Sequence, residues 1–146
     1  MKILCIAIGN SLRGDDGVAH RIAERLERSA GVEVRSVLQL APEDASEVAH
    51  AEVVVFIDAD VDATEPSIEP VITAGLRGTP LLHSLRPCEV VWFAERLFGF
   101  AGRAYLCRVP VEAFEGEGLT AVAEAGAAGA VVLLHGLVTA SLELCR

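Results

Sequence analysis

The feature that most constrains the fold is a short, continuous apolar run, VVVFI, at residues 53–57. It is bounded by charged residues, is rich in β-branched side chains and is too short for a typical helix, so it predicts a β-strand. A strand that is apolar at every position is buried on both faces, which is typical of a central strand in a parallel sheet. The run therefore favours an α/β fold in which helices cover both faces of the sheet.

The rest of the chain alternates between strand and helix patterns. Further strands are predicted at Ile3–Ile8 and at residues 32–38, 68–73 and 103–109, and helices at residues 16–26, 42–49, 87–98 and 121–142. Pro70 cannot donate to a ladder, so the strand that contains it is expected at a sheet edge. The alternation predicts one domain, residues 1–146, with a three-layer α/β/α architecture and a mostly parallel central sheet of about five strands.

The charge of the chain limits its partners. Lys and Arg number 12 against 21 Asp and Glu, which gives a formal net charge of −9. A nucleic-acid-binding protein needs a basic face, so no nucleic acid is expected as a partner. The acidic balance suits a cation or a partner with a basic segment.

The four cysteines are Cys5, Cys88, Cys107 and Cys145, and they form no CxxC or Cys/His zinc pattern. Cys5 and Cys107 lie inside predicted strands, so buried free thiols in a reducing cytoplasm are expected. The sequence begins directly with a predicted strand and shows no signal-peptide cleavage pattern. A cytoplasmic location is therefore predicted.

The stretch at residues 121–142 is long enough for a membrane span, and Glu124 and His135 are its only ionisable residues. Most of it, however, is Ala and Gly, which are weakly hydrophobic, and an imidazole in its second half is costly in lipid. We therefore expect a buried C-terminal helix that Thr120 caps, and no membrane partner.

Two adjacent carboxylates, Asp15 and Asp16, follow the first strand after a Gly9-Asn10 turn, just before helical spacing begins. The simplest interpretation is helix capping, since aspartate suits the positive end of a helix dipole. One aspartate is enough for a cap. The second is then free to point at the carboxyl ends of the strands, where open α/β sheets bind ligands.

Three side chains, Asp16, Asp58 and His83, fall at or just beyond predicted C-terminal strand ends. Two carboxylates and one imidazole suit a borderline divalent cation such as Zn, Ni, Co or Fe, and they leave coordination positions open. Asp60 and Asp62 are expected in a solvated loop.

Other chemistries remain as alternatives. His20 lies one turn after Asp16 and is an alternative ligand, although such a pair is usually a local contact. Cys88 could form a nucleophile pair with His83. The chain has no GxSxG or Walker motif, and Asp15-Asp16 repels phosphate, so nucleotide binding at Gly9-Asn10 ranks last.

Four segments resemble the motifs of one family, the hydrogenase maturation endopeptidases. Residues 8–17 (IGNSLRGDDG) resemble its opening strand followed by GNxLxxDDG, and residues 54–59 (VVFIDA) its second strand ending in Asp-Ala. Residues 83–87 (HSLRP) resemble its HxLxP motif, and residues 114–120 (FEGEGLT) are similar to the loop before its last helix. The segments occur in family order over nearly the whole chain.

The resemblance implies a cytoplasmic, nickel-dependent endopeptidase of aspartic or metal-assisted type. Its partner would be the large-subunit precursor of a nickel–iron hydrogenase, from which it removes a C-terminal extension after nickel insertion. The metal-contacting and catalytic residues of the family fall on Asp16, Asp58 and His83, and the nickel is supplied by the substrate. An alternative from another class is a metal-sensing assembly factor that binds the precursor without cutting it.

Overall fold

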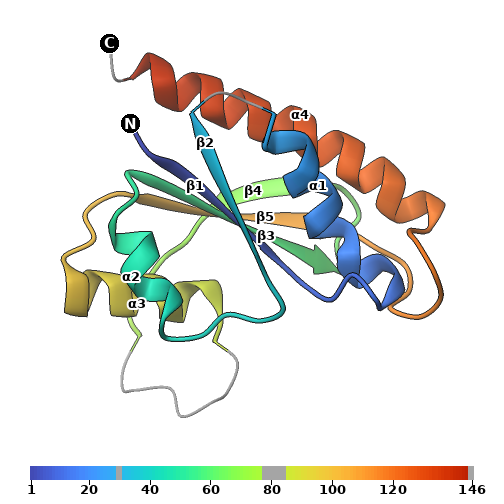
Figure 1. The fold of residues 1–146 in the computed structure, drawn as a ribbon, viewed down its shortest axis with the longest axis horizontal. Helices are drawn as coiled ribbons and strands as arrows, with labels where there is room; N and C mark the ends of the chain where they lie inside the picture. The colour runs from blue at the N-terminus through green and yellow to red at the C-terminus, as the bar shows by residue number, and fades with distance from the viewer. Residues whose placement is uncertain (29–30, 77–84, 145–146) are drawn as a thin grey trace.

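The computed structural model describes residues 1–28, 31–76 and 85–144. Five strands and four α-helices follow one another along these ranges, together with one short 3-10 helix, Gly14–Gly17, between β1 and α1 (Figure 1). The strands are β1 (Ile3–Ile8), β2 (Val32–Val37), β3 (Val53–Asp60), β4 (Ser67–Pro70) and β5 (Arg103–Pro110). The helices are α1 (Val18–Leu26), α2 (Asp44–Ala49), α3 (Pro87–Phe98) and α4 (Ala121–Glu143).

The strands form one sheet in the order β2-β1-β3-β5-β4. All neighbouring pairs are parallel except β4 and β5, which are antiparallel. The apolar strand β3 is the middle strand, and β4, which contains Pro70, is an edge strand, as predicted. The predicted mostly parallel sheet of about five strands is confirmed.

Helices cover both faces of the sheet, so the chain has the predicted three layers. Helices α1 and α4 lie on one face and α2 and α3 on the other (Figure 1). Alternate residues of β3 enter the two cores: Val53, Val55 and Ile57 pack toward α1 and α4, and Val54 and Phe56 toward α2 and α3. This accounts for the continuous apolar run, because a strand between two helical layers has no solvent-facing side.

The cysteines that the structure describes are free, as expected, and two of them are in the core. Cys5 and Cys107 are completely buried, and burial raises the pKa of each thiol to about 12. They are therefore protonated and unreactive at neutral pH. Cys145 lies outside the described residues.

Several element bounds differ from the prediction, among them those of β3, of α2 and of β4, which ends at Pro70 rather than at residue 73. Strand β3 continues to Asp60, since Asp58 to Asp60 pair with Arg108 to Pro110 of β5. The expectation that Asp60 lies in a loop is thus wrong, whereas Asp62 is exposed. Helix α2 begins at Asp44 rather than Pro42, and the Asp44 carboxylate accepts a hydrogen bond from the backbone N–H of Ala41 (2.8 Å).

Helix α4 begins where the sequence predicts, with the Thr120 hydroxyl accepting from the backbone N–H of Ala123 (3.2 Å). It has 23 residues and is long and apolar enough to cross a membrane by length and composition. One side of the helix, including Ala127 and Leu134, is buried on the sheet, while Val132 on the other side is exposed. The expected burial therefore holds for the sheet-facing side alone.

Candidate functional site

The turn after β1 holds Asp16 at the carboxyl edge of the sheet. The backbone N–H of Asn10 donates to Oδ2 of Asp16 (2.8 Å), and the backbone of Gly9 lies directly against Asp16. Gly9 has a φ of +144°, and a Cβ at this position would lie 2.0 Å from the carbonyl oxygen of Asp16. A side chain cannot fit there, so glycine is what allows the 3-10 helix to bring Asp16 next to the strand end.

Asp58 lies beside this turn, on β3. Strand β1 pairs with β3 only as far as Ile57, so Asp58 is the first residue of β3 beyond that ladder. Burial raises the pKa of Asp58 to about 6; the Ala59 backbone hydrogen bond opposes this rise, and the negative charge of Asp16 adds to it. Strand β3 and the 3-10 helix that carries Asp16 are in contact, so the two half-buried carboxylates are close enough to interact electrostatically.

Asp15 does not cap α1, although capping was the simplest interpretation of the pair. It is completely buried, and its carboxylate accepts from the backbone N–H groups of Glu112 (2.8 Å), Ala113 (3.1 Å) and Thr120 (2.7 Å) and from the Thr120 hydroxyl (2.7 Å). The N-cap of α1 is Gly17, which has no side chain to cap with. Asp15 thus ties the 3-10 helix to the loop before α4, and Asp16 remains available for chemistry.

The third predicted ligand, His83, lies outside the described residues. Within the ranges that are described, no group of three or more His, Cys, Asp and Glu side chains could hold a metal ion. The donors that the fold brings together are the Asp16 and Asp58 carboxylates, whose hard oxygens suit a divalent cation but cannot complete its coordination alone.

The alternative site residues His20, Gly9-Asn10 and Cys88 are all described by the structure. Nε2 of His20 is hydrogen-bonded to the carbonyl oxygen of Gly9 (2.6 Å), so this ring nitrogen contacts the turn backbone rather than the Asp16 side chain. The backbone N–H of Gly9 donates to Val37 (3.0 Å) and that of Asn10 to Asp16, which leaves neither amide free for a phosphate. Cys88 lines a cleft that also contains Asp58, whereas its proposed partner His83 is outside the described residues.

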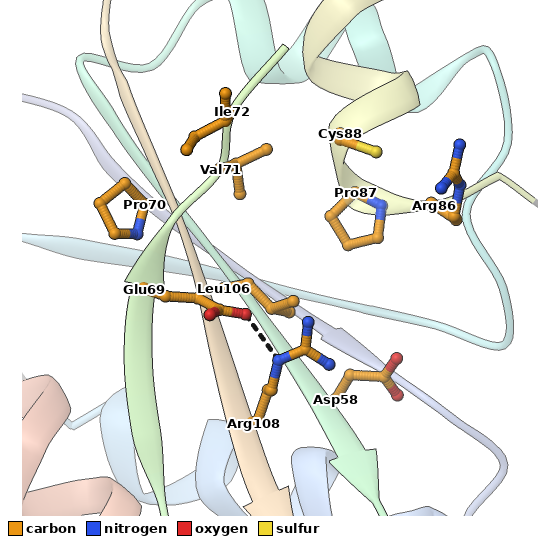
Figure 2. A pocket seen from close by; sticks show the side chains of 10 residues that line it. All are labelled: Asp58, Glu69, Pro70, Val71, Ile72, Arg86, Pro87, Cys88, Leu106 and Arg108. Atoms are coloured by element: carbon orange, nitrogen blue, oxygen red, sulfur yellow. Dashed lines mark hydrogen bonds and ion pairs between the residues drawn. The ribbon is translucent and has the colours of Figure 1, made fainter. Parts of the chain in front are cut away.

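A cleft of about 370 Å³ opens beside Asp58 (Figure 2). One wall comes from β3, β4 and β5, and the other from the start of α3. The lining includes Asp58, Glu69 and Arg108 on the first wall and Arg86, Pro87 and Cys88 on the second. Asp58 therefore lies at the border between the two-carboxylate turn and an open cleft that can receive an extended segment.

Sequence reasoning missed Arg108, which organises the sheet side of the cleft. Its guanidinium donates to Glu69 (2.6 Å; Figure 2). It also donates to Asp60 (3.4 Å), and its positive charge partly offsets the rise in the pKa of Asp58. The available signal was an arginine between two buried residues, Cys107 and Val109, of a predicted strand. Arg108 itself is exposed, and a carboxylate on a neighbouring strand is the cross-strand partner that such an arginine favours.

The raised pKa of Asp58 predicts a pH-dependent difference in stability. The pKa of Asp58 is about 6 in the folded protein against 3.8 ordinarily. The stabilisation that protonated Asp58 gives the folded state is therefore fully present below pH 3.8 and is lost as the pH rises through 6. The side chain introduced by Asp58→Asn cannot ionise. As the pH rises from 4 to 8, the free energy of unfolding of this variant should therefore increase by about 2–3 kcal/mol relative to that of wild type. Urea denaturation at both pH values measures this. The exposed Asp62→Asn is the control, and an equal gain there would contradict the assignment.

No protein-family model matches the sequence, and no curated protein does. Solved structures do share the fold. The hydrogenase maturating endopeptidase HybD from E. coli has a TM-score of 0.77 and 24% identity, covering 97% of this chain and 94% of that one. A hydrogenase 2 maturation peptidase from a Thaumarchaeota archaeon has a TM-score of 0.69 and 20% identity, covering 94% and 98%.

A third structure, the nickel–iron hydrogenase maturation protease HycI from Thermococcus kodakarensis, has a TM-score of 0.68 and 22% identity. The similarity covers 91% of this chain and 89% of the HycI chain. These likenesses extend over nearly the full length of each chain. The protein therefore has the fold of the hydrogenase maturation endopeptidases, which confirms at the level of the fold the resemblance carried by its sequence motifs.

Proposed function

We propose that this protein is an endopeptidase that removes the C-terminal extension from the large-subunit precursor of a nickel–iron hydrogenase. It acts in the cytoplasm, after nickel has been inserted, and recognises the nickel that the precursor carries. The observation that carries the proposal is the placement of Asp16 and Asp58 at one edge of the sheet, in a chain with this fold.

The geometry suits a metal ion that belongs to the substrate. Asp16 and Asp58 supply two carboxylates, which can add ligands to a nickel ion that the precursor already holds. His83 is the third proposed ligand. Burial and the neighbouring negative charge of Asp16 make the charged form of Asp58 costly, and an incoming cation relieves that repulsion.

The cleft beside Asp58 suits the peptide segment that is to be cut. In the proposed complex the nickel ion fixes the precursor against the two carboxylates, and the extension lies in the cleft between β4 and the start of α3. A metal held at this point would position the scissile carbonyl near a water molecule and polarise it. Asp16, Asp58 and His83 are thus the proposed catalytic and metal-contacting residues.

Intact-mass measurement of the large subunit tests the proposal. The purified protein is incubated with nickel-loaded precursor, and the mass of the large subunit is expected to fall by that of a C-terminal fragment. Precursor without nickel is the control and should remain uncut. Binding of the precursor with no change in mass would reject the endopeptidase function and favour the assembly-factor alternative.

A further inference from the structure

Large apolar side chains are exposed at the carboxyl ends of three adjacent strands. Leu12 follows β1 and is 88% exposed, Leu38 follows β2 and is 71% exposed, and Val61 follows β3 and is 53% exposed. Leu12 belongs to the GNSLRGDDG motif, yet the fold does not bury it, so core packing does not explain it. Apolar side chains gathered around one edge point to a contact with another macromolecule.

Backbone contacts near two of these side chains define where they lie. The Asn10 side chain accepts a hydrogen bond from the backbone N–H of Leu12 (2.9 Å), while the Asn10 backbone binds the Asp16 carboxylate. The backbone N–H of Gly9 donates to the carbonyl of Val37, which precedes Leu38. Leu12 and Leu38 are thus linked to the same short turn as Asp16.

A groove of about 250 Å³ lies within this arrangement. Its lining includes Gly9, Ser11 and Leu38, and Leu12 follows Ser11 in the chain. Gly9 also contacts Asp16, so the groove and the carboxylate share the residue between them. A single partner molecule can therefore place one of its apolar side chains in the groove and a bound cation at Asp16 and Asp58.

We propose that Leu12, Leu38 and the groove that Leu38 lines, together called the leucine groove, form the docking surface for the precursor protein around its metal centre. This inference rests on the proposed function, because the partner is the substrate of that reaction. The occupant is a protein segment with apolar side chains that flank a cationic centre, because Asp16 and Asp58 provide negative charge beside the leucine groove.

The test compares Leu12→Ser/Leu38→Ser with wild type, using the full chain and nickel-loaded precursor. Both side chains are exposed, so thermal unfolding should be unchanged, whereas the Kd and KM for the precursor should rise about 10- to 100-fold with kcat preserved at saturation. Leu12→Met/Leu38→Met should retain binding. The matched control is Leu97→Ser on α3, which is 66% exposed and near the opposite edge of the sheet.

The outcomes separate the docking surface from the catalytic function. If the double Ser variant binds and cleaves the precursor like wild type, the docking surface is wrong and the endopeptidase function stands. If binding depends on the leucine groove but the precursor stays uncut, the docking surface stands and the endopeptidase function is wrong. If wild type does not bind the precursor, both are overturned. An equal loss in Leu97→Ser would also overturn the docking surface.

Discussion

Asp16→Asn and Asp58→Asn are each expected to slow precursor cleavage by about 10²–10³-fold while the fold is retained. Asparagine keeps an oxygen of the same geometry, so the hydrogen bond from the Asn10 backbone to position 16 can persist. It lacks the negative charge with which each carboxylate would bind the nickel ion of the substrate. The rate of appearance of the processed large subunit, followed by intact mass, measures the effect.

Two further variants make this prediction specific. The double variant should lose little more activity than either single variant, because residues that act on one ion are not independent. Asp62→Asn changes an exposed aspartate on the segment after β3 and should process the precursor at the wild-type rate. Normal processing by both single variants would reject the assigned site, and unfolding of either variant would assign that residue a structural role instead.

Asp15→Ala is expected to lower the free energy of unfolding by about 3–5 kcal/mol. The carboxylate is completely buried and is the acceptor for three backbone N–H groups and one hydroxyl, from Glu112, Ala113 and Thr120. Alanine would leave these donors without their acceptor and would release the 3-10 helix from the loop before α4. Urea denaturation at pH 7 measures the loss, which corresponds to a fall in Tm of roughly 10 °C.

The pH dependence of Asp15 has the opposite sign to that of Asp58. Burial alone would raise its pKa, but the hydrogen bonds from Thr120, Glu112 and Ala113 outweigh burial and hold the pKa below its usual value of 3.8. Its stabilisation is therefore complete above pH 3.8 and is lost as the pH falls through the lowered folded pKa. Asp15→Asn, which keeps one acceptor oxygen, should be intermediate at pH 7. A loss below about 1 kcal/mol for Asp15→Ala would contradict the structural role.

The elements whose signals are local could be predicted from the sequence. Strand Ile3–Ile8 is found with the predicted bounds, since a continuous apolar run of that length is too short for a typical helix and suits a buried strand. Helix α3 begins at Pro87 and ends before Gly99, which adopts the left-handed conformation expected at a helix C-terminus. Each of these signals lies in neighbouring residues, so no knowledge of the rest of the fold is needed.

The candidate site was only partly accessible from the sequence. The placement of Asp16 and Asp58 at one edge could be predicted, because parallel strands end at the same side of a sheet. Arg108 was missed, because its partners Glu69 and Asp60 become neighbours only through the pairing of β5 with β3 and β4. His83 stays a prediction from sequence alone.

The sequence by itself determined the alternation of strands and helices, the central position of β3 and the edge at which two carboxylates would gather. Only the tertiary structure decided which member of Asp15-Asp16 is tied to the loop before α4, because one partner of the Asp15 carboxylate is Thr120, 105 positions along the chain. Adjacent aspartates have the same local propensities. What distinguishes them is the hydrogen-bond donors that distant segments bring to one of them, and these are set by packing rather than by the neighbouring sequence.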